Sequence, residues 1–272
     1  MAASVLKRFV DDGSDTLLWL EFEDYARQVF AGGGGDWYGD AARYAGTLIQ
    51  AQGALKSDVL TVDVVGPFLG ATSTEASAVV EALGAAAAND FVDQVLNALV
   101  HRFGGQLDIV LGVRAPADLL GGAGASFDDL DDVTTALTAL VRRHADKPLA
   151  GLLLSRCGTP QLNADEVDAY EPLFGAARHY QWATALSFVD CEDGVFDAGG
   201  LDADLVLLPA TSLAALGDTA AESRLGGGLN AAFWRGETPL DATAAAGRLL
   251  YGTIPADAQP ETVLSVLRAL RA

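Results

Sequence analysis

Eight short apolar segments alternate with longer helical segments along the chain, and this alternation limits the possible folds more than any other feature. The apolar segments have the length and branched composition of strands buried on both faces of a sheet. Parallel strands that alternate with helices predict an α/β fold, a (β/α)8 barrel in a single domain over residues 1–272. The expected strands lie at residues 16–22, 58–67, 107–113, 149–155, 182–188, 203–208, 224–229 and 248–251.

The helical segments fall between these strands. The alternative architecture is an open, doubly wound sheet, but neither a Gly-x-Gly-x-x-Gly motif nor a Walker loop follows the first strand. The glycines at residues 32–35 are interpreted as a flexible loop or a lid over the barrel mouth. The expected helices cover residues 40–56, 74–102 with a break near Gly84, 126–145, 164–178, 212–221, a segment from Asp241, and 260 to nearly 272.

The composition is strongly acidic and bears on partners. The formal net charge is −20, which repels nucleic acid and anionic membranes. No apolar run reaches the roughly 20 residues of a membrane span, and the first residues lack a signal peptide's apolar stretch. We therefore expect a cytoplasmic protein with a small-molecule substrate and no nucleic-acid or membrane partner. A high-salt cytoplasm and a high-GC genome both explain the acidic composition.

Chemistry in parallel barrels is placed at the C-terminal ends of the strands. Asp63 is the first candidate, because a carboxylate that ends a buried strand needs a partner, a raised pKa or a wet cleft. Its alternative role is an acid hydrogen-bonded to loop backbone. The remaining polar candidates after the strands are Glu21, Glu23, Asp24, Arg114, Arg156, Cys157, Asp190, Cys191, Asn230, Arg235 and Tyr251.

Two arginines stand among these acids. Arg114 and Arg156 could clamp a carboxylate or phosphate while Asp63 handles a proton. They could equally neutralise Asp63 and Glu21 in a structural ion-pair network. The three histidines fall on helices or helix ends, away from the expected mouth, so none is placed to activate Cys157; they are His101, His144 and His179.

Several stretches are similar to the uroporphyrinogen decarboxylase superfamily, which includes cobalamin-independent methionine synthase and corrinoid methyltransferases. Residues 91–120 resemble its helix followed by Gly-x-x-x-x-[Ile/Val]-x-Gly-x-x-x-x-Pro-x-x-Leu, and residues 226–230 resemble its Gly-Asn-Leu strand. Residues 252–271 resemble its closing helix. In residues 58–65, Asp63 falls on the position of the decarboxylase's essential aspartate. The resemblance implies an enzyme and a homodimer with facing mouths.

The chain departs from the decarboxylase where the tetrapyrrole binds. Residues 17–25 match the segment that carries the family's arginines. The family's tryptophan is kept here, but acids, among them Glu21 and Glu23, stand where the family has arginines. A polycarboxylate would meet like charge there. The family's late histidine is absent, with Tyr251 nearby. A non-porphyrin substrate is therefore expected.

The zinc motif of the methyltransferase branch is also incomplete. Its His-x-Cys corresponds to Val189-Asp190-Cys191, and no cysteine occurs later in the chain. A zinc ion would need replacement ligands such as Asp190 or Glu192. The residues predict no particular cofactor, zinc stays open as an alternative, and Asp190 and Cys191 are the candidate metal ligands. Cys157 and Cys191 are expected to be free thiols.

These observations lead to two hypotheses. The first is an enzyme that acts on a small non-porphyrin substrate by decarboxylase-like lyase chemistry or by one-carbon transfer. Its expected catalytic residues are Asp63 and Tyr251, and its expected substrate-binding residues are Glu21, Glu23, Arg114, Arg156 and Asn230. The second is a non-catalytic relative that binds a ligand or a protein. A concave pocket with a perturbed carboxylate would favour the first.

Overall fold

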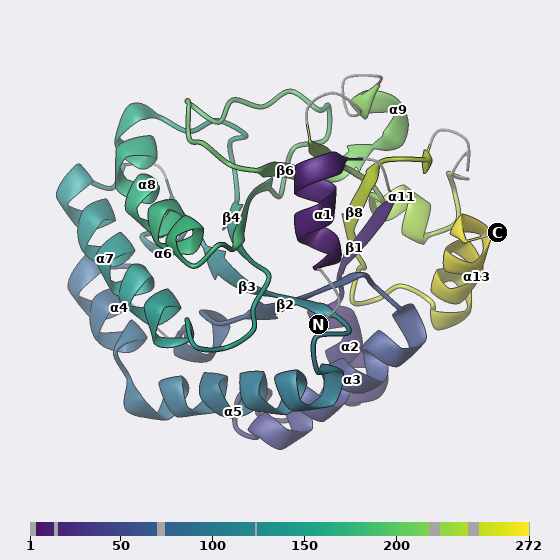
Figure 1. Ribbon diagram of the computed structural model, residues 1–272, viewed down its shortest axis with the longest axis horizontal. Coiled ribbons are helices and arrows are strands. Elements are labelled where there is room, and N and C mark those ends of the chain that lie inside the picture. The colour runs from purple at the N-terminus through teal and green to yellow at the C-terminus, as the bar shows by residue number, and fades with distance from the viewer. Residues whose placement is uncertain are drawn as a thin grey trace.

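Eight parallel strands close into one barrel surrounded by helices (Figure 1). The computed structural model describes residues 4–13, 16–69, 74–122, 124–217, 224–238 and 245–271. The first strand pairs with the last, from Leu17 against Leu249 to Glu21 against Thr253, so an open sheet is excluded and the predicted (β/α)8 barrel is confirmed. The strands are β1 Leu17–Glu21, β2 Val59–Asp63, β3 Asp108–Arg114, β4 Gly151–Arg156, β5 Ala183–Phe188, β6 Leu205–Ser212, β7 Leu225–Gly228 and β8 Leu249–Thr253.

Most of the helices cover the outer face of the barrel (Figure 1). Two of their N-termini carry clear side-chain caps: the Ser126 side chain accepts from the Asp129 N–H, and Asn163 forms a capping box with Glu166. The helices are α1 Val5–Asp12, α2 Glu23–Phe30, α3 Ala41–Leu55, α4 Ala76–Leu83, α5 Ala86–Phe103, α6 Pro116–Leu119, α7 Phe127–Arg143, α8 Ala164–His179, α9 Leu213–Leu216, α11 Ala231–Trp234 and α13 Pro260–Leu270. None of the helices in these described ranges is long and apolar enough to cross a membrane.

Two expected helices differ from, or fall outside, this description. The one expected at residues 212–221 is the short α9, and residues 218–223 lie outside the described residues. The one expected from Asp241 also begins outside them. The segment expected to run as a strand to residue 67 ends at Asp63, because Gly66 and Pro67 form a 3-10 turn, Gly66–Phe68.

The inside of the barrel is closed at its N-terminal end by α1, a helix not predicted from the sequence. Leu6 and Phe9 of α1 pack with the inward residues of the strands, such as Leu17 and Val110. Asp108, which begins β3, fixes the helix by accepting hydrogen bonds from the Ser4 hydroxyl at 2.9 Å and the Leu6 N–H at 2.7 Å. Figure 1 shows α1 crossing the barrel.

The barrel interior changes from apolar to polar toward the C-terminal ends of the strands. Trp19 of β1 and Tyr251 of β8 mark the boundary, with ring centroids 5.7 Å apart and planes at 86°. Both rings are buried. Because side chains alternate along a strand, the inward residues beyond these rings form the next layer, and they include Glu21 and Ser187. This polar layer forms the base of the barrel mouth.

Candidate active site

A cavity of about 450 Å³ lies at the C-terminal mouth of the barrel. This volume is within the range of about 300–1,000 Å³ that is usual for small-molecule sites. Seven of the eight strands or the loops after them contribute to its wall. The lining side chains that carry polar groups are Glu21, Glu23, Asp24, Tyr38, Thr61, Asp63, Arg114, Ser155, Cys157, Ser187, Tyr251 and Thr253.

Glu21, at the end of β1, is held by two donors from the barrel interior. Its Oε1 accepts a hydrogen bond from Trp19 Nε1 at 3.0 Å and another from the Thr61 hydroxyl. Burial raises the pKa of Glu21 to about 7, and the charge of Asp63 adds to the rise while the two hydrogen bonds oppose it. Glu21 is therefore divided between its acid and its carboxylate form near neutral pH.

Glu23 begins α2 and is held by aromatic side chains from the next loop. Its Oε1 accepts from Trp37 Nε1 at 2.9 Å and from the Tyr38 hydroxyl at 3.2 Å. Burial raises the pKa of Glu23 to about 7, and the charge of Asp63 is the second cause. Tyr38 forms the cavity wall beside Glu23. The glycines at residues 32–35, interpreted from the sequence as a flexible loop or a lid, do not line the cavity.

Asp63 ends β2. It is hydrogen-bonded to loop backbone and also lines the cavity, so the two roles considered from the sequence are both seen. Its Oδ1 accepts hydrogen bonds from the N–H groups of Val65 at 2.8 Å and Gly66 at 2.9 Å, while the side chain lines the cavity. Burial raises the pKa of Asp63, and these two hydrogen bonds and the charge of Arg114 offset part of the rise. The loop turn therefore fixes the carboxylate in place without removing it from the cavity.

Gly66 is required where this turn passes the site. A Cβ atom at this position would lie 2.3 Å from the Tyr38 hydroxyl oxygen and 2.6 Å from Asp63 Oδ2. Both distances are far below van der Waals contact, so any side chain would displace the two groups. The glycine thus leaves room between two polar atoms of the site.

The strands next to β1 and β2 add one cation, from β3, and one neutral phenol, from β8. Arg114, at the end of β3, lines the cavity and its side chain is exposed. Tyr251 is buried, and its pKa is raised well above the usual value by burial and by Glu21. The phenol is therefore un-ionised at neutral pH. Ser187 lies within reach of it; the serine hydroxyl is wholly buried and makes no hydrogen bond of ordinary geometry.

Two residues expected to bind substrate lie elsewhere. Arg156 is buried outside the barrel wall, where it pairs with Asp118 and donates from Nε to Glu166 Oε1 at 2.8 Å. It is a structural cation, but its partners are not Asp63 and Glu21, the acids expected from the sequence. Asn230 caps α11, its Oδ1 accepting from the Phe233 N–H at 3.1 Å. Neither Arg156 nor Asn230 lines the mouth cavity.

The residues considered for zinc do not form a metal site. Asp190 is exposed and accepts from the Gly158 N–H at 2.7 Å, whereas the buried Cys191 sulfur contacts the Val195 carbonyl oxygen at 3.4 Å. Within the described ranges, no three His, Cys, Asp or Glu side chains are grouped so as to hold a metal ion. The donor set of this part of the chain therefore does not fit zinc.

Cys157 lines the cavity, but its environment does not favour a nucleophile. Burial raises the pKa of its thiol, and the charges of Asp118 and Asp190 raise it further. A thiol with a raised pKa supplies little thiolate at neutral pH. No histidine lines the cavity either: His144 is buried against Asp93 at 3.2 Å, in agreement with a structural role.

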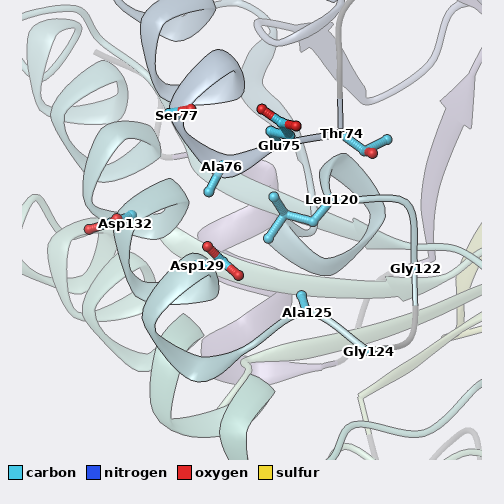
Figure 2. A pocket seen from close by; sticks show the side chains of 10 residues that line it. All are labelled: Thr74, Glu75, Ala76, Ser77, Leu120, Gly122, Gly124, Ala125, Asp129 and Asp132. Carbon is cyan, nitrogen blue, oxygen red and sulfur yellow. The ribbon is translucent and has the colours of Figure 1, made fainter.

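A second hollow, of about 620 Å³, lies outside the barrel beside the N-terminal ends of α4 and α7 (Figure 2). Its acids include Asp129 and Asp132 of α7, where negative charge favours the helix dipole. Asp129 Oδ2 accepts a hydrogen bond from the capping Ser126 hydroxyl at 2.7 Å. Helix capping therefore accounts for Asp129, and no residue of the described strands lines this hollow, so we place the candidate active site at the mouth.

Comparison with known proteins shows the class of fold. No protein-family model matches the chain, and no curated protein matches its sequence. Among solved structures, the apo form of the homocysteine methyltransferase MmuM from Escherichia coli is similar, with a TM-score of 0.56, 14% identity and 98% of each chain covered. The catalytic domain of the major endoglucanase from Xanthomonas campestris pv. campestris has a TM-score of 0.50, 15% identity and 94% coverage of each chain. At these identities the likeness concerns the barrel fold alone.

Proposed function

We propose that the chain is a barrel enzyme that performs lyase chemistry of the decarboxylase kind on a small non-porphyrin substrate at this mouth. Glu21 and Glu23 would exchange protons with the substrate, Asp63 would orient it, and Arg114 would bind its carboxylate. The observation that carries the proposal is the convergence of Glu21, Glu23 and Asp63 on one cavity, with the pKa of both glutamates near 7.

The chemical argument concerns the proton that decarboxylation consumes. When a substrate carboxylate leaves as carbon dioxide, the electron pair of the broken carbon–carbon bond remains on carbon and must be protonated. A carboxylic acid with a pKa close to the working pH is suited to donate that proton and to recover it from water. Guanidinium binds carboxylate well, and Arg114 lines the mouth, which supports its proposed role in binding the substrate carboxylate.

One-carbon transfer receives less support from the residues. The methyltransferase branch relies on zinc held by histidine and cysteine, whereas Asp190 and Cys191 are engaged with other partners. The likeness to a homocysteine methyltransferase concerns the fold at 14% identity. Acid–base lyase chemistry is therefore the function that we propose.

The test works without a candidate substrate. The purified protein is incubated with the small-molecule fraction of a cell extract, and compounds and released carbon dioxide are followed by mass spectrometry. We expect one compound to be depleted with carbon dioxide release, and Asp63→Asn to slow this by about 100-fold or more because the substrate loses its orienting group. The matched control is Asp165→Asn, at an exposed acid of α8, which should keep the wild-type rate.

Urea unfolding of each variant verifies that it is folded. Depletion without carbon dioxide release, or equal rates for Asp63→Asn and wild type, would overturn the proposal. If no compound is consumed, the site would be a binding site only, which is the non-catalytic alternative.

A further inference from the structure

We propose that the substrate of this mouth carries a protonated amine, which binds between Glu21, Glu23 and Asp63 while Arg114 faces its other end. The inference deepens the proposed function and rests on it for the view that the bound molecule is a substrate. It is based on hydrogen-bond acceptors without donors, on a buried hydroxyl that makes no hydrogen bond of ordinary geometry, and on the charges that line the cavity.

The first observation is that, in each of the three carboxylates, one oxygen accepts two hydrogen bonds from the protein. Oε1 of Glu21 and Oε1 of Glu23 each accept two side-chain hydrogen bonds, and Oδ1 of Asp63 accepts two backbone hydrogen bonds. In the described part of the chain, no hydrogen bond reaches Oε2 of Glu21 or Oδ2 of Asp63. Carboxylate oxygens in a partly buried site need donors. An ammonium group supplies three.

The second observation concerns Ser187, which comes from the opposite side of the barrel. Its hydroxyl is wholly buried, lines the same cavity and lies beside the Tyr251 phenol, but makes no hydrogen bond of ordinary geometry. A buried hydroxyl whose hydrogen bonding is incomplete is uncommon in folded proteins. It therefore marks a position where a polar group of a bound ligand would complete the site.

The third observation is the balance of charge. Four acidic side chains line the cavity, Glu21, Glu23, Asp24 and Asp63, and Arg114 is the cation among its described lining residues. A cationic group would relieve the repulsion among these acids, whereas a polyanion would add to it. We assign the cation to an organic amine, because an ammonium group supplies hydrogen-bond donors as well as a positive charge.

A linkage to pH follows from this arrangement. A cation bound beside Glu21 and Glu23 favours their ionised forms and lowers their pKa from about 7. Binding near pH 7 should therefore release protons, and affinity should increase as the pH rises through 7. At pH 9 both glutamates are already ionised, so proton release should vanish.

The test uses four probes of matched size: butylammonium, 4-aminobutyrate, butyrate and 1-butanol. Binding is followed by NMR at the backbone amides of Val65 and Gly66, because these amides donate to Asp63 and report its environment. We expect the two amines to bind and to weaken about tenfold between pH 8 and pH 5.5, as the glutamates become protonated. Calorimetry in buffers of different ionisation enthalpy should detect proton release at pH 7.

Two variants and one control make the test specific. Glu23→Gln and Asp63→Asn should each weaken amine binding about tenfold or more, whereas Asp165→Asn should leave it unchanged. Equal binding of butyrate or butanol, or an amine affinity independent of pH, would overturn the inference. If turnover is found with a substrate that lacks an amine, only this inference fails. If amines bind as expected but no compound is consumed, the proposed function fails and the cation site stands.

Discussion

The Thr61 hydroxyl of β2 donates a hydrogen bond to Oε1 of Glu21 at the end of β1. Trp19 completes a triangle with them, since its Nε1 lies 3.0 Å from Glu21 Oε1 and 2.9 Å from the Thr61 oxygen. The carboxylate that follows the first strand is thus fixed against the second strand. Both contacts stabilise the ionised form of Glu21, whereas its burial stabilises the neutral form.

We expect Thr61→Val to raise the pKa of Glu21 above its value of about 7, because the change keeps the shape of the side chain and removes a donor to the carboxylate. The titration of side-chain carboxyls by ¹³C NMR measures this directly. Thr138→Val is the matched control, since that buried hydroxyl on α7 makes no hydrogen bond. A lower or unchanged pKa of Glu21 in Thr61→Val would show that the hydrogen bond does not control this group.

Glu21→Gln should stabilise the protein at pH 8. The folded-state pKa of about 7 exceeds the value of 4.5 for a free glutamate, so the folded state binds more protons than the unfolded state between these values. The free energy of unfolding therefore falls as the pH rises from 4.5 through 7, in total by up to about 3 kcal/mol for this group. A glutamine has no charge to bury and avoids this loss.

The measurement is urea unfolding of wild type and Glu21→Gln at pH 5 and pH 8. The stabilisation should be larger at pH 8 and should shrink toward zero as the pH approaches 4.5. Glu192→Gln, at an exposed position outside the cavity, is the control and should show no such dependence. A variant that is equally stabilised at both pH values would contradict the assignment of the shift to burial.

Gly66→Ala should impair the site with little effect on the fold. The added Cβ would press on the Tyr38 hydroxyl and on Asp63 Oδ2, so the Tyr38 donor to Glu23 and the position of Asp63 would both be lost. We expect amine binding and turnover to fall by about tenfold or more. Gly53→Ala in α3 is the control, because a Cβ there meets nothing within 4 Å and should stabilise by about 0.5–1 kcal/mol. If the Gly66→Ala variant binds amines as tightly as wild type, the site does not require a glycine at this position.

Arg156→Met should destabilise the fold by about 3–5 kcal/mol, because it leaves Asp118 and Glu166 without their buried counter-charge. The loss should be smaller at pH 5 than at pH 8, because burial raises the pKa of Asp118 and its unpaired carboxyl can bind a proton at the lower pH. The control is Arg178→Met, whose ion pairs with Glu171 and Asp202 are largely exposed and should be worth less than about 1 kcal/mol. Equal effects of the two changes in urea unfolding would contradict a buried network.

The fold could be predicted because its signal is repeated eight times. Each expected strand overlaps an observed one, and the closure of β1 on β8 follows from their number. The helices α1 and α2 were not predicted, because each has only eight residues and stands apart from a longer helical segment, whereas the equally short α4 directly precedes the long α5. The position of α1 depends on its packing against the barrel interior, which only the closed fold creates.

The candidate site was predicted in part, for a reason that lies in the geometry of strands. The sequence shows which residues lie at a strand end. Whether a side chain faces the barrel interior or the surrounding helices depends on the alternation of side chains along the strand, which requires the exact strand bounds. In β4, Leu153 and Ser155 line the mouth cavity and Arg156 points to the helices. The same alternation, applied to β2 and β5, would have indicated Thr61 and Ser187, neither of which was predicted.

The acidic composition predicts that salt stabilises this protein. With a formal net charge of −20, repulsion among surface acids opposes the compact state at neutral pH. Raising the ionic strength from 0.1 M to 1 M shortens the screening length from about 10 Å to about 3 Å. We therefore expect the melting temperature at pH 7.5 to rise steadily with sodium chloride over this range.

The control for this prediction is the same titration at a pH near the isoelectric point of about 4.2. There the net charge is close to zero, so screening has little repulsion to remove and the gain should largely disappear. Sodium chloride is preferred to sulfate, because sulfate strengthens apolar burial independently of charge. A melting temperature at pH 7.5 that does not change with salt would mean that the acids are spaced widely enough to avoid repulsion, and the composition would then reflect the genome rather than adaptation to salt.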